Sequence, residues 1–250
     1  MDKKVILRFE SHIHTNFSDG NFYKLMIRAA IKKRIDILAI TDHNTMKGYE
    51  YCVRYAKECS KRNLGDIFIL QAEEVECKEG DILAYGITEQ IKKGILLHEA
   101  IDNIHEQGGL AVVAHPFNIS TSVSAVNIDK NTFDGIEIIN FHCLDITNIL
   151  AKRFATSRPS LFRIGGNDAH QPWAIGIVLN IIEAEPETDS ILKSLKNKKI
   201  RVFQSPKSFP WRVHFFFKYY VGDLLTILRT NLLKNYSNEI LKMNTCENQS

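Results

Sequence analysis

The sequence predicts an α/β protein built around a mainly parallel, barrel-like sheet, and two observations lead to this fold class. Short apolar runs alternate with amphipathic segments through residues 1–200, as in proteins made of successive strand–helix units. Several predicted strands also end at or next to His, Asp or Glu. This is expected at the carboxyl ends of the strands of an α/β barrel, where active sites lie. The chain of 250 residues, 44% of them hydrophobic, is long enough for one sizeable domain with an appendage.

The predicted strands and helices follow one another along the chain. Apolar runs bounded by polar turns predict strands at 4–9, 35–43, 67–76, 82–87, 110–116, 135–142 and 161–170. Apolar residues at helical spacing predict helices at 22–34, 46–62, 96–109, 146–157 and 189–199. Residues 78–81 are expected to form the turn between two neighbouring strands, and Gly108 and Gly109 to close the third helix.

Charge is unevenly distributed between the two parts of the chain. The formal net charge is +3, but residues 193–250 contain 11 Lys or Arg against 3 Asp or Glu, whereas residues 1–192 contain 21 against 26. An acidic body is suited to binding metal cations. A basic tail is suited to an interaction surface, although a solvated charged face is the commoner explanation for such a run.

Cysteine usage and the N-terminus indicate the compartment. The five cysteines form no CxxC pair, which is typical of free thiols in a reducing cytoplasm. The chain reaches charged residues and histidine by His12, so no signal peptide is predicted. No uninterrupted apolar run is long enough to span a bilayer. We therefore expect a cytoplasmic protein.

Side chains able to bind metals stand at or just after the ends of six predicted strands. They are His12 and His14, Asp42 and His43, Glu73 and Glu74, His115, Asn140 and His142, and Asp168 and His170. The carboxyl ends of the strands of an α/β barrel surround one site, so these residues are expected to converge. Nitrogen and oxygen donors without cysteine suit Zn, Mn or Fe, and their number indicates more than one ion.

A single residue of this kind would carry little weight. Two histidines one residue apart are also what a strand with one polar face shows. The repetition argues for a metal centre, because unpaired charged groups are costly to bury in a core. His98 and His105 lie on one predicted helix instead and are expected to be surface residues.

Five segments, taken in order, resemble the PHP (polymerase and histidinol phosphatase) family of metal-dependent phosphoesterases. They are HIHTNFSDG at 12–20, ITDHNT at 40–45, AEEVE at 72–76, AHPF at 114–117 and GGNDAHQPWAIG at 165–176. The resemblance covers roughly residues 5–205 and implies a distorted (β/α)7 barrel with two or three divalent metal ions. It implies one ion at His12, His14, Glu74 and Asp168, a second shared by Glu74 and His115, and a third at Asp19, His43 and His170.

Two positions depart from the family pattern. Many relatives carry a further histidine on the strand after the glutamate motif, where the nearest polar residue of this chain is Asp81. The family position that holds Asn or His falls on Asn140, with His142 two residues further on, and His142 is a candidate ligand of the second ion. The family's Gly-x-Glu-Val pattern aligns with Glu74, which places Glu73 on the other side of the strand.

These residues predict hydrolysis of a phosphate ester by a metal-activated water. A metal-bound water, Asp168 or His170 is expected to protonate the leaving group, and Asp42 is expected to orient a ligand or take part in catalysis. Candidate substrates are a nucleotide, the end of an oligonucleotide or a small phosphomonoester, and the length of the chain argues against a domain of a polymerase. The alternatives are an amidohydrolase-like reaction at a C–N bond and a non-catalytic metal-binding scaffold.

The chain beyond the family motifs is expected to be a separate segment. We predict a phosphoesterase domain at 1–205 and a basic, aromatic-rich helical extension at 206–250. From Val213 on, residues 209–235 place apolar side chains at most helical positions. Three roles for this extension stay open: covering the outside of the barrel, forming a homo-oligomer, or lying on an anionic membrane surface.

Overall fold

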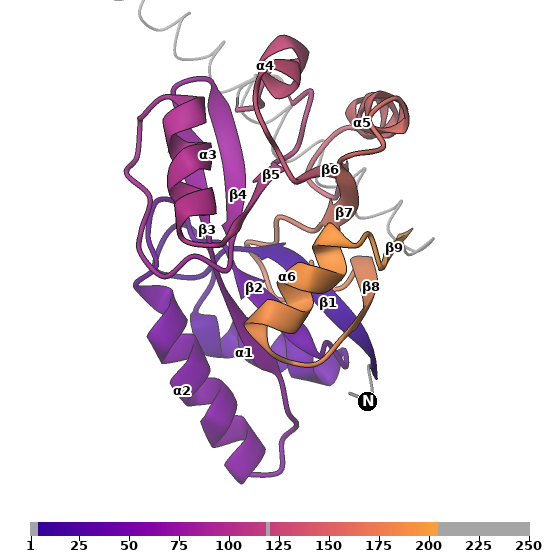
Figure 1. The fold of residues 1–250 in the computed structure, drawn as a ribbon. Coiled ribbons are helices and arrows are strands. Elements are labelled where there is room, and N and C mark those ends of the chain that lie inside the picture. The colour runs from indigo at the N-terminus through magenta and orange to yellow at the C-terminus, as the bar shows by residue number, and fades with distance from the viewer. Residues whose placement is uncertain (1–4, 119–120, 205–250) are drawn as a thin grey trace, which may run out of the picture. The chain divides into compact units, whose positions relative to one another are not determined.

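The computed structural model of the protein describes residues 5–118 and 121–204 (Figure 1). The strands are β1 (Val5–Ile13), β2 (Ile37–Ile40), β3 (Phe68–Cys77), β4 (Gly80–Tyr85), β5 (Leu110–Val113), β6 (Gly135–Asn140), β7 (Phe162–Gly166), β8 (Val178–Ala184) and β9 (Ile200–Gln204). The helices are α1 (Tyr23–Lys32), α2 (Gly48–Lys61), α3 (Leu97–Glu106), α4 (Ala125–Lys130), α5 (Asp145–Thr156) and α6 (Thr188–Lys196). The predicted extension at 206–250 lies outside the described residues.

The nine strands of the described residues form one sheet in the order β7-β6-β5-β4-β3-β2-β1-β8-β9. Seven of them run in one direction, and β4 and β8 run against their neighbours. The sheet curls into a nearly closed barrel with helices outside it, which confirms the predicted distorted α/β barrel (Figure 1). Part of the distortion comes from β4, which returns from β3 through the predicted tight turn instead of a crossover helix.

The two sides of the barrel meet at the end of β1. The backbone N–H of Ala169, just after β7, donates to the carbonyl of His12 at 3.1 Å. The N–H of His14 donates in turn to the carbonyl of Ala169 at 3.1 Å. Segments far apart in the sequence, 12–14 and 168–170, therefore lie side by side.

Apolar side chains fill the barrel interior. Phe9 of β1 and Tyr85 of β4 are fully buried there among inward-facing residues of the other strands. Ile191, Leu192 and Leu195 of α6 join the same cluster, so this helix, which packs against β8, covers part of the interior (Figure 1). The interior is therefore a packed core, which leaves the carboxyl ends of the strands for a functional site.

The outer helices cover the sheet in two groups. Met26 of α1 and Cys52 of α2 pack against Leu38 and other outward-facing residues of β1 to β3. Ile101 of α3 packs in a separate cluster with Ile82 and residues of β5 and β6. Within the described part of the chain, no helix is both long enough and apolar enough to cross a membrane.

Three elements are not predicted by the sequence: α4, β8 and β9. Strand β8 pairs antiparallel with β1, and β9 pairs antiparallel with β8. The apolar pattern of β8 is interrupted by Asn180, which is buried. The amide of Asn180 donates to the carbonyls of Phe9 and Gly165, and its oxygen accepts from the N–H of Gly165. These hydrogen bonds satisfy a polar residue that would otherwise be unfavourable inside a strand.

Candidate metal centre

His12, His14, Glu74 and Asp168 form the middle of the site. The two histidines alternate with Ile13 on β1, so both imidazoles lie on one side of the strand. Nε2 of His12 lies 3.1 Å from Nε2 of His14 and 3.0 Å from Oε2 of Glu74. Nε2 of His14 lies 3.1 Å from Oε2 of Glu74 and 3.1 Å from Oδ1 of Asp168. Nitrogen and oxygen atoms from β1, β3 and the end of β7 thus converge on one point.

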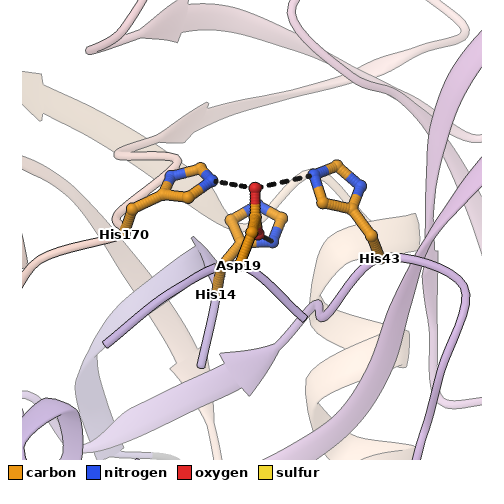
Figure 2. Close-up of side chains that lie close together, drawn as sticks. All are labelled: His14, Asp19, His43 and His170. Atoms are coloured by element: carbon orange, nitrogen blue, oxygen red, sulfur yellow. Dashed lines mark hydrogen bonds and ion pairs between the residues drawn. The ribbon is translucent and has the colours of Figure 1, made fainter. Parts of the chain in front are cut away.

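Asp19, His43 and His170 surround His14 on its solvent side (Figure 2). Oδ2 of Asp19 lies 3.1 Å from Nε2 of His170 and 3.9 Å from Nε2 of His43. The rings of His43 and His170 stack on the ring of His14, with centroids 4.4 Å and 4.3 Å away. Because the side chain of Asp19 is 56% exposed, these residues form an outer ligand group open to solvent.

Glu74, Asp81 and His115 form an inner ligand group on the other side of Glu74. Oε1 of Glu74 lies 2.8 Å from Nε2 of His115, while Oε2 faces the histidines of β1. Asp81 stands at the start of β4, and these three residues can each place one ligand atom within 4.8 Å of the others. The carboxylate of Glu74 is therefore shared between two sets of ligands.

His142 lies with Asp168 and His170. Its Nδ1 is 3.8 Å from Oδ2 of Asp168, and its ring stacks on that of His170 at 5.3 Å between centroids. Burial is the main cause that lowers the pKa of His142 to about 4, so the ring is neutral and can offer a lone pair. We expected His142 to contribute to the second ion beside His115. The structure places it at the opposite edge of the centre instead, because β6 and β7 are neighbours there.

Glu137, a buried carboxylate that the sequence analysis does not single out, supports two of the predicted ligands. Its Oε1 lies 3.0 Å from Nδ1 of His12, and its Oε2 accepts from the backbone N–H of His115 at 2.7 Å. The amide of Asn140 donates to Oε2 of Glu137 at 3.0 Å, so Asn140 is engaged behind the ligands. A Cβ at Gly166 would lie 1.8 Å from Oε1 of Glu137, so β7 can approach this carboxylate only with glycine at that position.

Asp42 lies behind the centre. Its Oδ1 accepts from the backbone N–H of Thr15 at 2.6 Å and from the hydroxyl of Ser18 at 2.8 Å. Its Oδ2 accepts from the hydroxyl of Thr15 at 2.7 Å. Both oxygens of Asp42 therefore fix the loop that carries Asp19. These contacts agree with the orienting role expected for Asp42, and its part in catalysis stays a prediction.

Two ligand positions have a strained backbone. Asp168 has φ of 51° and His115 has φ of 28°, in or near the left-handed region that side chains rarely adopt. The loop after β7 is held by Glu10, whose Oε2 accepts from the amide of Asn167 at 2.5 Å and from the N–H of Gly176 at 2.7 Å. Strain of this kind persists where the surrounding structure enforces it, and it is common at functional sites.

The electrostatics of the centre favour positive charge. Burial lowers the pKa of His14, but its ion pairs with Asp168 and Glu74 outweigh burial and raise it to about 10. Burial likewise opposes the ion pair of His115 with Glu74, which prevails and raises the pKa of His115 to about 9. Burial would raise the pKa of Glu74 and of Asp168, yet the facing histidines hold both well below the usual range. In the metal-free protein, protons bound to His14 and His115 supply this positive charge.

The donor atoms fit divalent cations. Nδ1 of His14 and Nδ1 of His43 are buried and have no hydrogen-bond partner among residues 5–118 and 121–204, so each has a lone pair that a metal ion could take or a proton without an acceptor. Ligand atoms held about 2 Å from one ion lie roughly 3–3.5 Å from each other. The contacts of His14 with Glu74 and Asp168 fall in that range. Imidazole and carboxylate donors suit Zn, Mn and Fe.

The structure brings every residue predicted as a metal ligand into one or more of these groups: His12, His14, Asp19, His43, Glu74, His115, His142, Asp168 and His170. Glu73 lies on the opposite face of β3, where Oε2 accepts from the N–H of Ile91 at 2.9 Å. Neither His98 nor His105 belongs to a group among the described residues; the first is exposed, and the second lies 2.8 Å from Asp134.

The fold and the clustered donors define an α/β-barrel protein with a candidate metal centre at the carboxyl ends of its strands. The family model of the PHP domain matches residues 10–247, a range that includes all of these ligand groups. The chain belongs to the PHP domain family.

Similarity to individual proteins agrees with this membership. An uncharacterized protein of Methanocaldococcus jannaschii, MJ1587, is 32% identical over 158 residues, which cover 58% of this chain and 89% of that protein. A two-domain protein of Bacteroides vulgatus, described as containing a predicted PHP-like metal-dependent phosphoesterase, aligns with a TM-score of 0.64 and 19% identity over 82% of this chain and 66% of its own. The lesion-specific endonuclease PfuEndoQ of Pyrococcus furiosus aligns with a TM-score of 0.55 and 15% identity over 79% of this chain and 58% of its own. At such identities, these structures support the fold alone.

Proposed function

We propose that this protein hydrolyses a phosphate ester with divalent metal ions bound by the ligand groups at the strand ends. The observation that carries the proposal is the position of Glu74, whose two carboxylate oxygens face different ligands. Oε2 lies 3.0 Å from His12 and 3.1 Å from His14, and Oε1 lies 2.8 Å from His115. A carboxylate shared in this way suits a two-metal site for displacement at phosphorus. Membership of the PHP domain family supports the same reaction.

Bound divalent ions would lower the pKa of an attacking water and neutralise the phosphate oxygens. Two residues were candidates for protonating the leaving group. Both oxygens of Asp168 face histidines, and its side chain is 14% exposed, which favours a ligand role. His170 is 26% exposed, and its Nε2 lies beside Oδ2 of Asp19 at the open rim. This placement favours His170 over Asp168 as the proton donor to the departing oxygen only while Nε2 is not bound to an ion, because a metal-bound imidazole nitrogen carries no proton.

An aromatic cluster beside the centre favours a nucleotide or an oligonucleotide end as the substrate. The cluster consists of Phe17, Tyr23, Tyr51 and Tyr55, and Phe17 belongs to the loop that carries Asp19. The ring centroids of Phe17 and Tyr51 lie 5.0 Å apart, and the guanidinium of Arg54 lies 4.6 Å from the centroid of Tyr51. Tyr51 is exposed and the other three rings are half-buried, and an exposed ring beside a cation is suited to stacking on a base and pairing with a phosphate. The fold resembles that of a lesion-specific endonuclease, which is a further reason to test oligonucleotides as substrates.

The test is a phosphatase panel of the purified chain. Chelator-treated protein, reloaded separately with Mn, Zn, Mg or Fe, would be assayed for phosphate release from sugar phosphates, nucleotides and short oligonucleotides. We expect release that depends on metal and is highest for nucleotides or oligonucleotides. Hydrolysis of amide substrates in the absence of phosphate release would favour the amidohydrolase-like alternative. Stoichiometric metal binding without any turnover would favour the scaffold.

A further inference from the structure

Three carboxylates share one face of the β3–β4 hairpin: Glu74, Glu76 and Asp81. In the antiparallel register, Glu76 stands directly opposite Asp81, and Glu74 stands opposite Leu83. Glu74 is therefore the diagonal neighbour of Asp81 on the same face. Like charges at such positions repel one another and destabilise the pair of strands, unless a positive group lies between them.

Glu76 has an ion-pair partner of its own, whereas the imidazole beside Asp81, that of His115, is engaged by Glu74 at 2.8 Å. The carboxylate of Glu76 is paired with the ammonium of Lys93. Asp81 is 6% exposed, and no hydrogen bond or ion pair within the described ranges involves its carboxylate. A buried carboxylate next to a second one is costly unless a cation compensates both.

The surroundings of Asp81 form a site that an ion can reach. The backbone N–H of Asp81 donates to the carbonyl of Thr121 at 2.8 Å, and the hydroxyl of Thr121 lies 3.4 Å from Nδ1 of His115. These contacts hold the start of β4 beside the imidazole of His115. A cavity of about 570 Å³, lined by residues that include His43, Asp81 and Thr121, opens onto this corner.

We propose that Asp81 is a metal ligand and that, with Glu74 and His115, it forms an oxygen-rich ion site whose preference for Mn²⁺ over Zn²⁺ is greater than that of the outer ligand group. The inner ligand group offers two carboxylates and one imidazole, whereas the outer one, together with His14, offers three imidazoles and one carboxylate, Asp19. Carboxylate oxygen suits Mn²⁺, and imidazole nitrogen suits Zn²⁺. The inference rests on the proposed function. It adds that two ion sites of the same centre prefer different metals.

The test measures metal binding instead of turnover. Chelator-treated full-length protein would be titrated with Mn²⁺ while the free ion is followed by electron paramagnetic resonance, and then with Zn²⁺ as competitor. Asp81→Ala should bind one Mn²⁺ fewer per chain, or bind it at least about tenfold more weakly. Asp81→His should keep the ion, but one added Zn²⁺ should displace it more readily than in the wild-type chain. Glu76→Gln, which changes the opposite carboxylate of the same face, is the matched control and should retain the wild-type number of ions.

The outcomes separate this inference from the proposed function. Should the wild-type chain bind two or more ions and Asp81→Ala bind the same number with affinities within twofold, Asp81 is not a ligand, and the phosphoesterase proposal stands. Equal displacement by Zn²⁺ in Asp81→His and the wild-type chain would overturn the selectivity. A wild-type chain that binds no Mn²⁺ or Zn²⁺ would overturn both. Circular dichroism of each variant would establish that the loss of an ion does not come from unfolding.

Discussion

Oε1 of Glu137 lies 3.0 Å from Nδ1 of His12, while Nε2 of the same ring faces His14 and Glu74. A hydrogen bond from Nδ1 to this carboxylate leaves Nε2 as the atom directed at the centre. The same carboxylate accepts from the N–H of His115, which belongs to the inner ligand group. One buried residue of β6 therefore orients ligands from β1 and from the end of β5.

Glu137→Gln should weaken metal binding while the fold survives. A glutamine side chain has one accepting oxygen and one NH2 group. Its NH2 group would face either the ring N–H of His12 or the N–H donors of His115 and Asn140, and that contact would then bring two donors together. We expect the affinity for metal to fall by about 10- to 100-fold, as is usual when a carboxylate behind a histidine ligand is lost. Calorimetric titration of chelator-treated protein measures the change. Affinity equal to that of the wild-type chain would show that the contact does not orient the ligand.

Asp168→Asn should abolish catalysis more fully than any change outside the centre. The substitution keeps the size of the side chain but removes the negative charge that faces His14 and His12. Metal-ion catalysis is worth several kcal/mol, so kcat/KM for a phosphate ester should fall on the order of 1,000-fold or more. His98→Ala, an exposed change on α3, should leave the rate within twofold. Near-normal turnover by Asp168→Asn would remove Asp168 from the ligand set.

Most of the ligands that the sequence predicts stand at the end of a recognisable apolar strand, whereas Asp19 lies in the loop after β1. His14, His43, His115 and Asp168 all come directly after such runs, and parallel strands present their carboxyl ends together. The convergence of these residues therefore follows from the fold class alone. His142 shows the limit of this reasoning, because the sequence places it at the right end of the barrel but not beside the right neighbours.

The residues that the sequence misses act through neighbours it cannot specify. Glu137 lies inside a strand, and the role of its buried carboxylate becomes apparent only from its contact with His12 across the barrel. Asp81 begins the strand that returns from β3, so its place in the centre depends on the register of a hairpin. Strand β8 escapes prediction because Asn180 interrupts its apolar pattern, and the partners of Asn180 lie on β1 and β7. Finding Glu137 and β8 requires pairings between distant segments, and finding Asp81 requires the register of the β3–β4 hairpin.

Metal-free protein should lose stability as the pH rises above neutrality. The folded-state pKa is about 10 for His14 and about 9 for His115, above the ordinary value of 6.5. Their ion pairs therefore contribute fully below pH 6.5 and are lost as the pH rises through 9 and 10. Glu74 and Asp168, whose pKa is lowered from 4.5 and 3.8, contribute above those values and lose their contribution as the pH falls below them. The melting temperature should thus be highest near pH 5–6.5.

A series of thermal melts from pH 4 to pH 10, with chelator and with saturating Mn²⁺, checks this dependence. Metal displaces the protons of the histidines, so the decline above neutrality should be much smaller in the loaded protein. A melting temperature of the metal-free chain that climbs between pH 7 and pH 10 would contradict the raised histidine pKa values.

Tyr51→Ala should reduce the preference for substrates with a base. The ring of Tyr51 is 46% exposed, contacts Phe17 of the loop that carries Asp19, and lies under Arg54. Stacking of one base on an aromatic side chain is worth about 1–3 kcal/mol, so the loss should lower kcat/KM for a short oligonucleotide by roughly 5- to 150-fold. An ester without any aromatic group, such as a sugar phosphate, gains nothing from this ring. The ratio of the two kcat/KM values should therefore fall in Tyr51→Ala.

Phe203→Ala, an exposed aromatic change on β9, is the control and should keep the wild-type ratio. An unchanged ratio in Tyr51→Ala would mean that the substrate does not stack on this surface, and it would favour a small phosphomonoester as the substrate.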